Sequence, residues 1–353
     1  MDLSINLTDP LLAELRPALT LRAPARLHLG FLDPAGSLGR RFGGLGLVVN
    51  GFESEIELSA ATTGQVTASG VAERAEIDRA VRCLHLLQRH CARQEPLHLR
   101  LIRVLPAHAG FGSGTNLALA IGRAFARWHG LSLATPRLAQ ILGRGQRSGI
   151  GIAGFDHGGL IVDGGPGADG APAPILSRLA LPPAWRVLVV QDSAHQGLSG
   201  ADEWHAIAAL PALPPVRAAE ICHQVLMRVL PGAASAEFAP FAAGITRIQR
   251  LLGEHFAPAQ GGSAYSSAAV GRLVEWIGER SAGTPGPAGG AAVGQSSWGP
   301  TGFAILPSQA TADAVVDAAR QARVIAPSLA LRIVSGRNAG AVVVDHRAAP
   351  DAR

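Results

Sequence analysis

The spacing of hydrophobic and polar positions predicts that the chain opens with β-strands. Between residues 21 and 31 hydrophobic side chains recur at every second position, the period of a strand with one buried face. Residues 45–50 and 53–58 predict two further strands. From residue 72 to residue 93 the period lengthens to that of an amphipathic helix. Residues 97–105 alternate again, so the opening is β-rich with one helix inserted.

The remainder of the chain mixes helices and strands. A glycine-rich segment at 106–116 separates the strand at 97–105 from an apolar helix at about 117–128. The pattern also predicts helices at 136–142, 215–230, 235–256, 266–280 and 310–323, and strands at 159–163, 185–191, 301–306, 329–334 and 341–344. Loops are expected at 164–174 and 281–290, which are rich in glycine, proline and alanine. An α+β protein follows, and the length of 353 residues suggests about two domains.

Composition narrows the chemistry, because all 31 lysine and arginine residues are arginine. The absence of lysine excludes a Walker-type P-loop, a Schiff-base mechanism and a lysine general base. The arginine forks suit small anions such as phosphates and carboxylates. Nucleic acid is not expected as a partner despite the net charge of +5, because the arginines are dispersed and only 5% of residues are aromatic.

Cysteine usage and hydropathy indicate the compartment. The three cysteines cannot all pair and form no Cys-x-x-Cys motif, which is typical of a reducing environment. No apolar stretch approaches the about 18–20 residues that span a bilayer, and the N-terminus lacks the basic region of a signal peptide. We therefore expect a soluble cytoplasmic protein with no membrane partner.

The strongest local signal is the segment 110–116, Gly-Phe-Gly-Ser-Gly-Thr-Asn. Glycines between a strand and a helix let backbone N–H groups surround an anion at the helix N-terminus. The alternative is an ordinary turn in which Ser113 or Thr115 caps the helix. The local pattern does not decide between these two interpretations.

A second signal lies in the segment 143–151, where Arg144 and Arg147 are three residues apart. If the preceding helix continues that far, both lie on one face and form a clamp for phosphate or carboxylate. A solvated helix end is the simpler interpretation. The residues 149–154 match G-x-G-x-x-G, but no strand precedes them, so a Rossmann site is rejected.

Three aspartates, Asp33, Asp163 and Asp192, each follow an expected strand. A carboxylate at that position is often part of a site, although capping a turn is its commoner use.

Three stretches together resemble the GHMP kinase superfamily, named for galactokinase, homoserine kinase, mevalonate kinase and phosphomevalonate kinase. They are residues 23–30 (Ala-Pro-Ala-Arg-Leu-His-Leu-Gly), 106–116, and 293–302 (Val-Gly-Gln-Ser-Ser-Trp-Gly-Pro-Thr-Gly). The resemblance implies a ribosomal-protein-S5-domain-2-like N-terminal domain and a ferredoxin-like C-terminal domain. We place these domains at 1–180 and 181–353.

Within that superfamily the sequence is similar to the β-ribofuranosylaminobenzene 5′-phosphate synthase family. The resemblance rests on Arg26-Leu-His28, Asp33 with Gly39-Arg40, the segments 43–46 and 112–115, the arginine segment 143–151, and the segments 155–159 and 163–165. It implies an enzyme that joins 4-aminobenzoate or 4-hydroxybenzoate to phosphoribosyl diphosphate with Mg²⁺, releasing CO₂ and diphosphate during tetrahydromethanopterin biosynthesis. A homodimer is also an expectation from this resemblance.

The resemblance leads to hypotheses for individual residues. Gly112, Ser113, Gly114 and Thr115 would cradle the diphosphate with Mg²⁺ nearby, and Arg144 and Arg147 would bind phosphate or carboxylate. Arg26, His28 and Arg40 would line the same cleft, and Asp33 would stabilise positive charge on the ring amine or the ribose. Asp163 or Asp192 would hold the metal. The remaining expected substrate or phosphate ligands are His108, Gly110, Ser148 and Ser297.

Two alternatives stay open at this point. An ATP-dependent GHMP small-molecule kinase fits the three motifs, although the absence of lysine and the Gly-Phe-Gly-Ser-Gly-Thr loop, in place of the Gly-Leu-Gly-Ser-Ser or Gly-Leu-Ser-Ser-Ser of kinases, disfavour ATP. A catalytically inactive binding protein on the same fold is the other.

Overall fold

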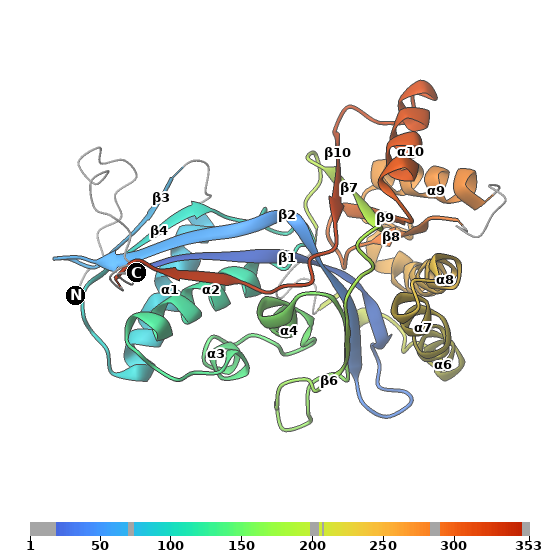
Figure 1. Cartoon of the computed structure of the whole chain (residues 1–353). Coiled ribbons are helices and arrows are strands. Elements are labelled where there is room, and N and C mark those ends of the chain that lie inside the picture. The colour runs from blue at the N-terminus through green and yellow to red at the C-terminus, as the bar shows by residue number, and fades with distance from the viewer. Residues whose placement is uncertain (1–18, 70–73, 198–204, 207, 283–289, 348–353) are drawn as a thin grey trace.

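The computed structural model describes residues 19–69, 74–197, 205–206, 208–282 and 290–347. Their elements form two β-sheets with helices packed against them (Figure 1). The first sheet and its helices comprise β1 (Leu19–Asp33), β2 (Phe42–Ala60), β3 (Gln65–Ala68), α1 (Arg74–Cys91), β4 (Leu97–Arg103), α2 (Ser113–Trp128), α3 (Thr135–Ile141), α4 (Ile150–His157), β5 (Leu160–Asp163) and β6 (Ile175–Leu179). The second comprises β7 (Arg186–Asp192), α6 (Pro215–Gln224), η2 (Val225–Val229), α7 (Leu230–Ala234), α8 (Phe238–Phe256), η3 (Ala257–Gln260), α9 (Ala268–Ala282), β8 (Ala292–Gln295), β9 (Thr301–Leu306), α10 (Gln309–Gln321) and β10 (Leu329–Ser335), and the last strand is β11 (Val342–Asp345).

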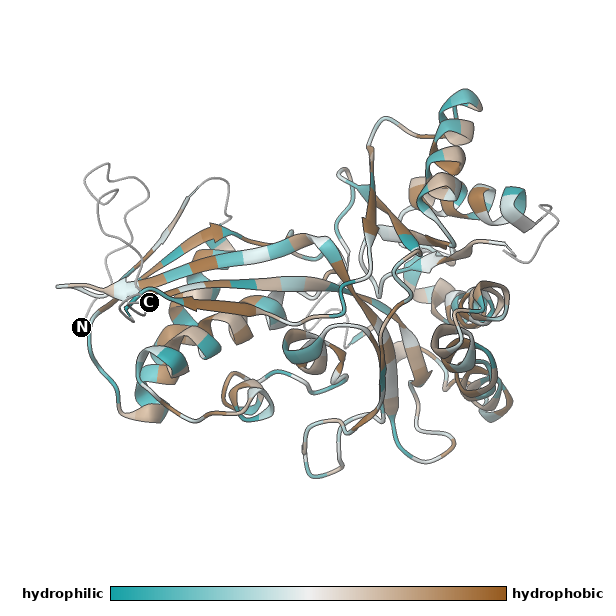
Figure 2. Ribbon diagram, in the orientation of Figure 1, coloured by the Kyte–Doolittle hydropathy of each residue, from teal (hydrophilic) through white to brown (hydrophobic). Residues whose placement is uncertain are grey.

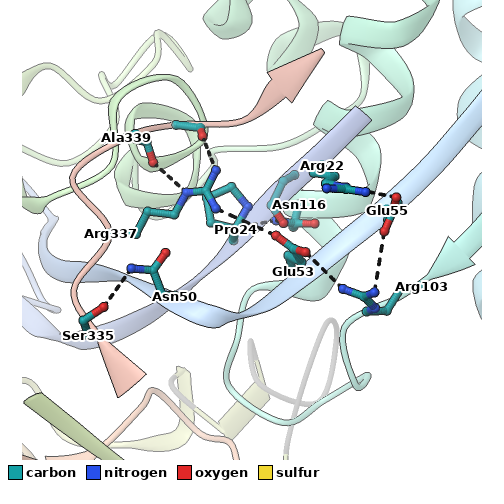
Figure 3. Close-up of polar contacts among 12 residues, drawn as sticks. Arg22, Pro24, Asn50, Glu53, Glu55, Arg103, Asn116, Ser335, Arg337 and Ala339 are labelled. Atoms are coloured by element: carbon teal, nitrogen blue, oxygen red, sulfur yellow. Dashed lines mark hydrogen bonds and ion pairs between the residues drawn. The ribbon is translucent and has the colours of Figure 1, made fainter. Parts of the chain in front are cut away.

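The first sheet has seven strands in the order β11-β1-β2-β4-β3, with β5 and β6 joined to it through β2. Helices α1, α2 and α4 pack against its strands (Figure 1). The hydrophobic positions of α1 predicted the helix correctly, because Ile77, Leu84 and Leu87 are buried in its core. Asn116 of α2 donates from its side-chain amide to the carbonyl of Pro24 at 2.8 Å, which fixes α2 against β1 (Figure 3).

The second sheet has the antiparallel order β10-β7-β9-β8. Numbered along the chain, this is the order 4-1-3-2 of a ferredoxin-like unit, with helices between its first and second strands and α10 between its third and fourth. The alternation in β7 explains the two layers of helices. Val187 and Val189 pack into the core with α6 and α8, whereas Leu188 and Val190 pack with α9 and α10.

The hairpin of β1 and β2 links the first sheet to the helices of the second sheet. Both strands are long and carry hydrophobic residues alternating with hydrophilic ones (Figure 2). The part of the hairpin near its turn reaches the helices of the second sheet, where β1 lies beside α6 and α8 (Figure 1). Here Leu27, Leu29 and Leu45 share one core with α8 residues such as Ile245 and Ile248. The residues just after β1's midpoint are therefore held between the two sheets.

The chain returns to the first sheet at its end, where β11 pairs antiparallel with β1. A run of alternating charges holds the connection from β10, since Arg337 lies 3.8 Å from Glu53 and Arg103 bridges Glu53 and Glu55 at 3.0 and 3.6 Å (Figure 3). Arg22 completes the run at 3.0 Å from Glu55. Partly exposed pairs of this kind contribute little individually, about 0–1 kcal/mol, and of these residues only Arg337 belongs to the connecting segment.

The expected fold class is confirmed by this arrangement, with two differences of detail. Helix α3 ends at Ile141, so residues 142–149 are not helical. Strand β11 lies in the first sheet, although it belongs to the sequence range expected for the C-terminal domain. The division of the chain at residue 180 stays a prediction. Residues 1–18 and 348–353 of the two expected domains lie outside the described residues. Among the helices of the described segments, none is long and apolar enough to cross a membrane.

Candidate active site

The glycine segment leads from β4 into the N-terminus of α2. Gly112 occupies the position before the helix with φ 73°, in the left-handed region, and no side chain caps the helix there. The alternative of a turn capped by Ser113 or Thr115 is therefore wrong. A Cβ atom at this position would also lie 2.9 Å from Cζ of Arg26, so a larger residue would displace the end of that side chain. An uncapped helix N-terminus of this kind is suited to binding an anion.

The three resembling stretches meet at one buried side chain, Ser296. Its Oγ donates to the carbonyl of Gly110 at 2.7 Å and accepts from the backbone N–H of His28 at 2.9 Å. The adjacent Ser297 donates its N–H to the carbonyl of His28 at 3.2 Å. Arg26 also donates to the Gly110 carbonyl, at 2.7 Å. The turn after β8 thus fixes the glycine segment relative to β1.

A cleft of about 260 Å³ opens at this junction. Four arginines, Arg26, Arg79, Arg144 and Arg147, contribute to its lining, and none of the described lining residues is acidic. The other lining residues are His108, Gly110, Gly112, Ser113, Gly114, Thr115, Ser297, Trp298 and Gly299. Such a cleft is complementary to a multiply charged anion.

Arg144 and Arg147 both reach this cleft, although not by the expected route. They lie in the non-helical segment after α3, so the premise of a shared helical face is wrong, although both side chains line the same cleft. The pKa of the Arg144 guanidinium is lowered, mainly by burial and further by the charges of Arg79 and Arg82. The Cys83 thiol acts in the opposite direction and raises this pKa. The buried Nε of Arg144 has no hydrogen-bond partner among the described residues. These cations therefore repel one another, and a bound anion would offset that repulsion.

His28 lies beside the same junction and is 4% exposed. Burial holds the pKa of its imidazole well below the usual range, and the charges of Arg26 and Arg147 lower it further. The ring is therefore neutral at neutral pH. Its buried Nε2 has no hydrogen-bond partner among the described residues.

The shifted pKa of His28 makes stability depend on pH. Below about pH 6.5 the unfolded chain takes up a proton that the folded ring accepts only at lower pH, so the free energy of unfolding should fall as the pH decreases. We expect His28→Asn to lose less stability than the parent between about pH 7.5 and about pH 5, measured by urea unfolding. His223→Asn, at an exposed position, is the control. A parent-like pH dependence in His28→Asn would contradict this prediction.

The aspartates and Ser148 are engaged elsewhere. Both carboxylate oxygens of Asp33 accept hydrogen bonds from the following turn, from the N–H groups of residues 36 and 38 and from the hydroxyl of residue 37. Asp163 is fully buried and accepts from Ser148 Oγ at 2.8 Å and from the N–H groups of Gly149 and Gly165 at 2.7 and 2.8 Å. Burial raises its pKa, while these hydrogen bonds oppose the rise. Asp163 thus holds the start of α4 in place.

The two expected metal ligands lie in different sheets. Asp192 ends β7 of the second sheet and accepts from Ser267 Oγ at 2.6 Å, whereas Asp163 belongs to the first sheet. The described part of the chain contains no group of three or more His, Cys, Asp or Glu side chains that could hold a metal ion. A resident Mg²⁺ does not fit the described lining of the cleft, since Mg²⁺ favours carboxylate ligands. Metal binding by either aspartate stays a prediction.

Sequence reasoning and structure differ at four further positions. Arg40 is exposed and donates to the carbonyl of Pro166 at 3.3 Å, outside the cleft lining. Arg79 lines the cleft but was missed, because it lies among ordinary polar positions of the amphipathic helix α1. Trp298 and Gly299 were also missed as individual residues, although they lie inside the third resembling stretch.

Comparison with known proteins places the chain in a family. The models for the GHMP kinases N terminal domain and the GHMP kinases C terminal domain match residues 78–159 and 231–325. A protein of Archaeoglobus fulgidus named beta-ribofuranosylphenol 5'-phosphate synthase is 36% identical over 307 residues, covering 83% of this chain and 89% of its own. The chain belongs to the beta-ribofuranosylphenol 5'-phosphate synthase family. A relative of the same name from Methanothermobacter thermautotrophicus is 29% identical over 347 residues, covering 92% of this chain and 98% of its own.

Solved structures confirm the GHMP kinase fold. Homoserine kinase from Cytophaga hutchinsonii superposes with a TM-score of 0.66 at 16% identity, covering 96% of this chain and 100% of its own. Mevalonate diphosphate decarboxylase from Staphylococcus aureus superposes with a TM-score of 0.63 at 13% identity, covering 93% and 98%. At these identities the likeness concerns the fold alone. The relatives named above are enzymes by name. The predicted membership of the GHMP kinase superfamily, and of the synthase family within it, is confirmed.

Proposed function

We propose that the chain transfers the 5-phosphoribosyl group of phosphoribosyl diphosphate to a benzoate that carries a hydroxyl or amino group at position 4. Diphosphate and CO₂ are released, as a step towards tetrahydromethanopterin. The observation that carries the proposal is the cleft of about 260 Å³ with four arginines, no acidic residue among its described lining, and the uncapped N-terminus of α2. The word phenol in the relatives' names supports a 4-hydroxybenzoate acceptor, and the amino analogue has the same electronic requirement.

The reaction balances without a basic group from the protein. The bond from the anomeric carbon to diphosphate breaks, and diphosphate leaves with the electron pair. The electron-donating group at position 4 directs the ring carbon that bears the carboxylate to attack the anomeric carbon. The bond from that ring carbon to the carboxylate then breaks, its electron pair restores the aromatic ring, and CO₂ leaves. An arginine-rich cleft can serve such a reaction by stabilising the departing diphosphate.

The described residues divide the work of binding phosphate. Backbone N–H groups at the start of α2 and the hydroxyls of Ser113 and Thr115 would donate hydrogen bonds to the diphosphate oxygens. Arg144 and Arg147 approach from the loop after α3, and Arg79 approaches from α1. Since the described lining offers no carboxylate, we propose that Mg²⁺ enters bound to the diphosphate of the substrate, through phosphate oxygens.

Release of labelled CO₂ tests the proposal. Purified protein is incubated with Mg²⁺, phosphoribosyl diphosphate and either 4-hydroxybenzoate or 4-aminobenzoate labelled in the carboxyl group. We expect labelled CO₂ and an equal amount of diphosphate with at least one acceptor, and none when ATP replaces phosphoribosyl diphosphate. Failure to release CO₂ from both acceptors would refute the proposal, and ATP consumption with a hydroxylated metabolite would identify a kinase instead.

A further inference from the structure

A second, smaller cavity of about 40 Å³ lies beside the arginine cleft. It is enclosed by β1, the end of α8, η3 and the turn after β8, and it shares Ser297 and Trp298 with the cleft. None of its described lining residues is an aspartate, a glutamate, a lysine or an arginine. They are His28, Gly30, Phe31, Gln249, Leu252, Gly253, Phe256, Gln260, Ala264, Gln295, Ser297 and Trp298. A cationic compartment and an uncharged compartment therefore meet at two residues.

The polar side chains of the small cavity are mostly committed to one another. Gln249 donates to the carbonyl of Leu29 at 2.6 Å and accepts from the N–H of Gln295 at 2.8 Å. Gln295 in turn donates to Oε1 of Gln260 at 2.9 Å. His28 is different, because its buried Nε2 has no partner among the described residues. The cavity thus has mainly apolar and amide walls, and one of its lining residues, His28, has a ring nitrogen without a hydrogen-bond partner among the described residues.

The size of the cavity limits what it can hold. A single water needs about 10–15 Å³ by this measure of volume, so about 40 Å³ admits a group of about three heavy atoms. A carboxylate has three heavy atoms, whereas a benzene ring has six and does not fit. A carboxylate seated here would place its aromatic ring at the boundary formed by Ser297 and Trp298, facing the cleft.

Surroundings without charge favour loss of CO₂. A carboxylate removed from water without a cation is destabilised, and CO₂, which is neutral, is not. An arginine beside the carboxylate would have the opposite effect, because it stabilises the ionised group and disfavours cleavage. His28 adds no charge to these surroundings at neutral pH, because burial holds the pKa of its ring well below the usual range.

We propose that this uncharged cavity receives the carboxylate of the benzoate acceptor and is the place where CO₂ forms, while the arginines bind only the phosphates of the other substrate. This inference rests on the proposed function. The bond between the ring carbon and the carboxylate carbon breaks in the cavity, and its electron pair returns to the ring, whose new bond joins the anomeric carbon in the cleft. Diphosphate leaves on the cleft side and CO₂ on the cavity side.

A charge placed in the cavity by Gln260→Glu tests the assignment. Glutamate has the shape of glutamine and retains an oxygen that can accept from Gln295. We expect the KM for 4-hydroxybenzoate to rise about tenfold through repulsion between the two carboxylates. The Ki of the uncharged inhibitor 4-hydroxybenzamide and the KM for phosphoribosyl diphosphate should each stay within about twofold. Gln260→Met, which removes the amide without adding charge, should change the benzoate and benzamide values equally.

The same measurements separate the possible failures. If benzamide does not inhibit the parent enzyme and Arg144→Gln raises the KM for benzoate, the arginines bind the carboxylate and the inference is wrong. Equal effects of Gln260→Glu on benzoate and benzamide would also overturn it. If the parent releases no CO₂ from either benzoate, the proposed function itself has failed, and that result is obtained before any variant is made.

Discussion

Replacement of Arg144 with glutamine should lower kcat/KM for phosphoribosyl diphosphate by about 10²–10³-fold, the loss typical of one donor to a developing negative charge. The same change should leave the unliganded protein at least as stable as the parent. Arg144 is buried near Arg79 and Arg82, and its lowered pKa reflects burial and their positive charges. Removing it relieves this repulsion, which the Cys83 thiol opposes and which a bound anion would compensate further.

Thermal unfolding with and without diphosphate measures both effects. Diphosphate should raise the Tm of the parent by several degrees and that of Arg144→Gln by much less. Arg137→Gln is a suitable control, since Arg137 is exposed on α3 outside the cleft lining. An Arg144→Gln variant with parent-like kinetics, or one that is unstable both with and without diphosphate, would contradict the assignment of Arg144 to anion binding.

Gly299→Ala should destabilise the protein by about 3 kcal/mol and abolish activity, because overpacking against backbone has no inexpensive relaxation. A Cβ atom at Gly299 would overlap the backbone of Ala109 and approach Gly110 Cα to 2.6 Å. The substitution therefore forces the glycine segment away from the turn that Ser296 joins to it. The cleft would open at the point where the three resembling stretches meet.

Urea unfolding and the CO₂ assay check this expectation. Gly278→Ala, in helix α9, is the matched control, since the added Cβ meets only the two side-chain methyl groups of Val293, the nearer at 3.2 Å. We expect near-parent stability and activity from the control. A Gly299→Ala protein with parent stability would show that the two segments are not in close contact.

The sequence predicted the fold well where its periodicity was strong. Helix α1 and strand β4 lie close to their expected bounds, and the glycine segment leads into α2 as expected. The third resembling stretch, residues 293–302, pointed to the cleft but did not show that Ser296 joins the other two stretches. Ser296 binds residues 186 and 268 positions away in the sequence, and no local pattern specifies such a bond.

The candidate site was predicted incompletely for a physical reason. The environment of a carboxylate at the end of a strand depends on burial and on distant donors. Asp33, Asp163 and Asp192 therefore looked alike in sequence, and the structure gives each one hydrogen bonds to neighbouring loops or side chains. Arg79 was missed for the converse reason, since an arginine on the polar side of a helix resembles any solvated one until α2 is packed beside it.

The pairing of β11 with β1 has a consequence for synthesis of the protein. The hydroxyl of Thr20 and the ring of His346 are 326 positions apart and only 3.0 Å from each other. The outermost strand of the first sheet is therefore added only after nearly all of the described chain has left the ribosome. Until then β1 is an open edge on which another nascent chain could pair, and Arg22, which is exposed there, supplies the kind of charge that discourages such pairing.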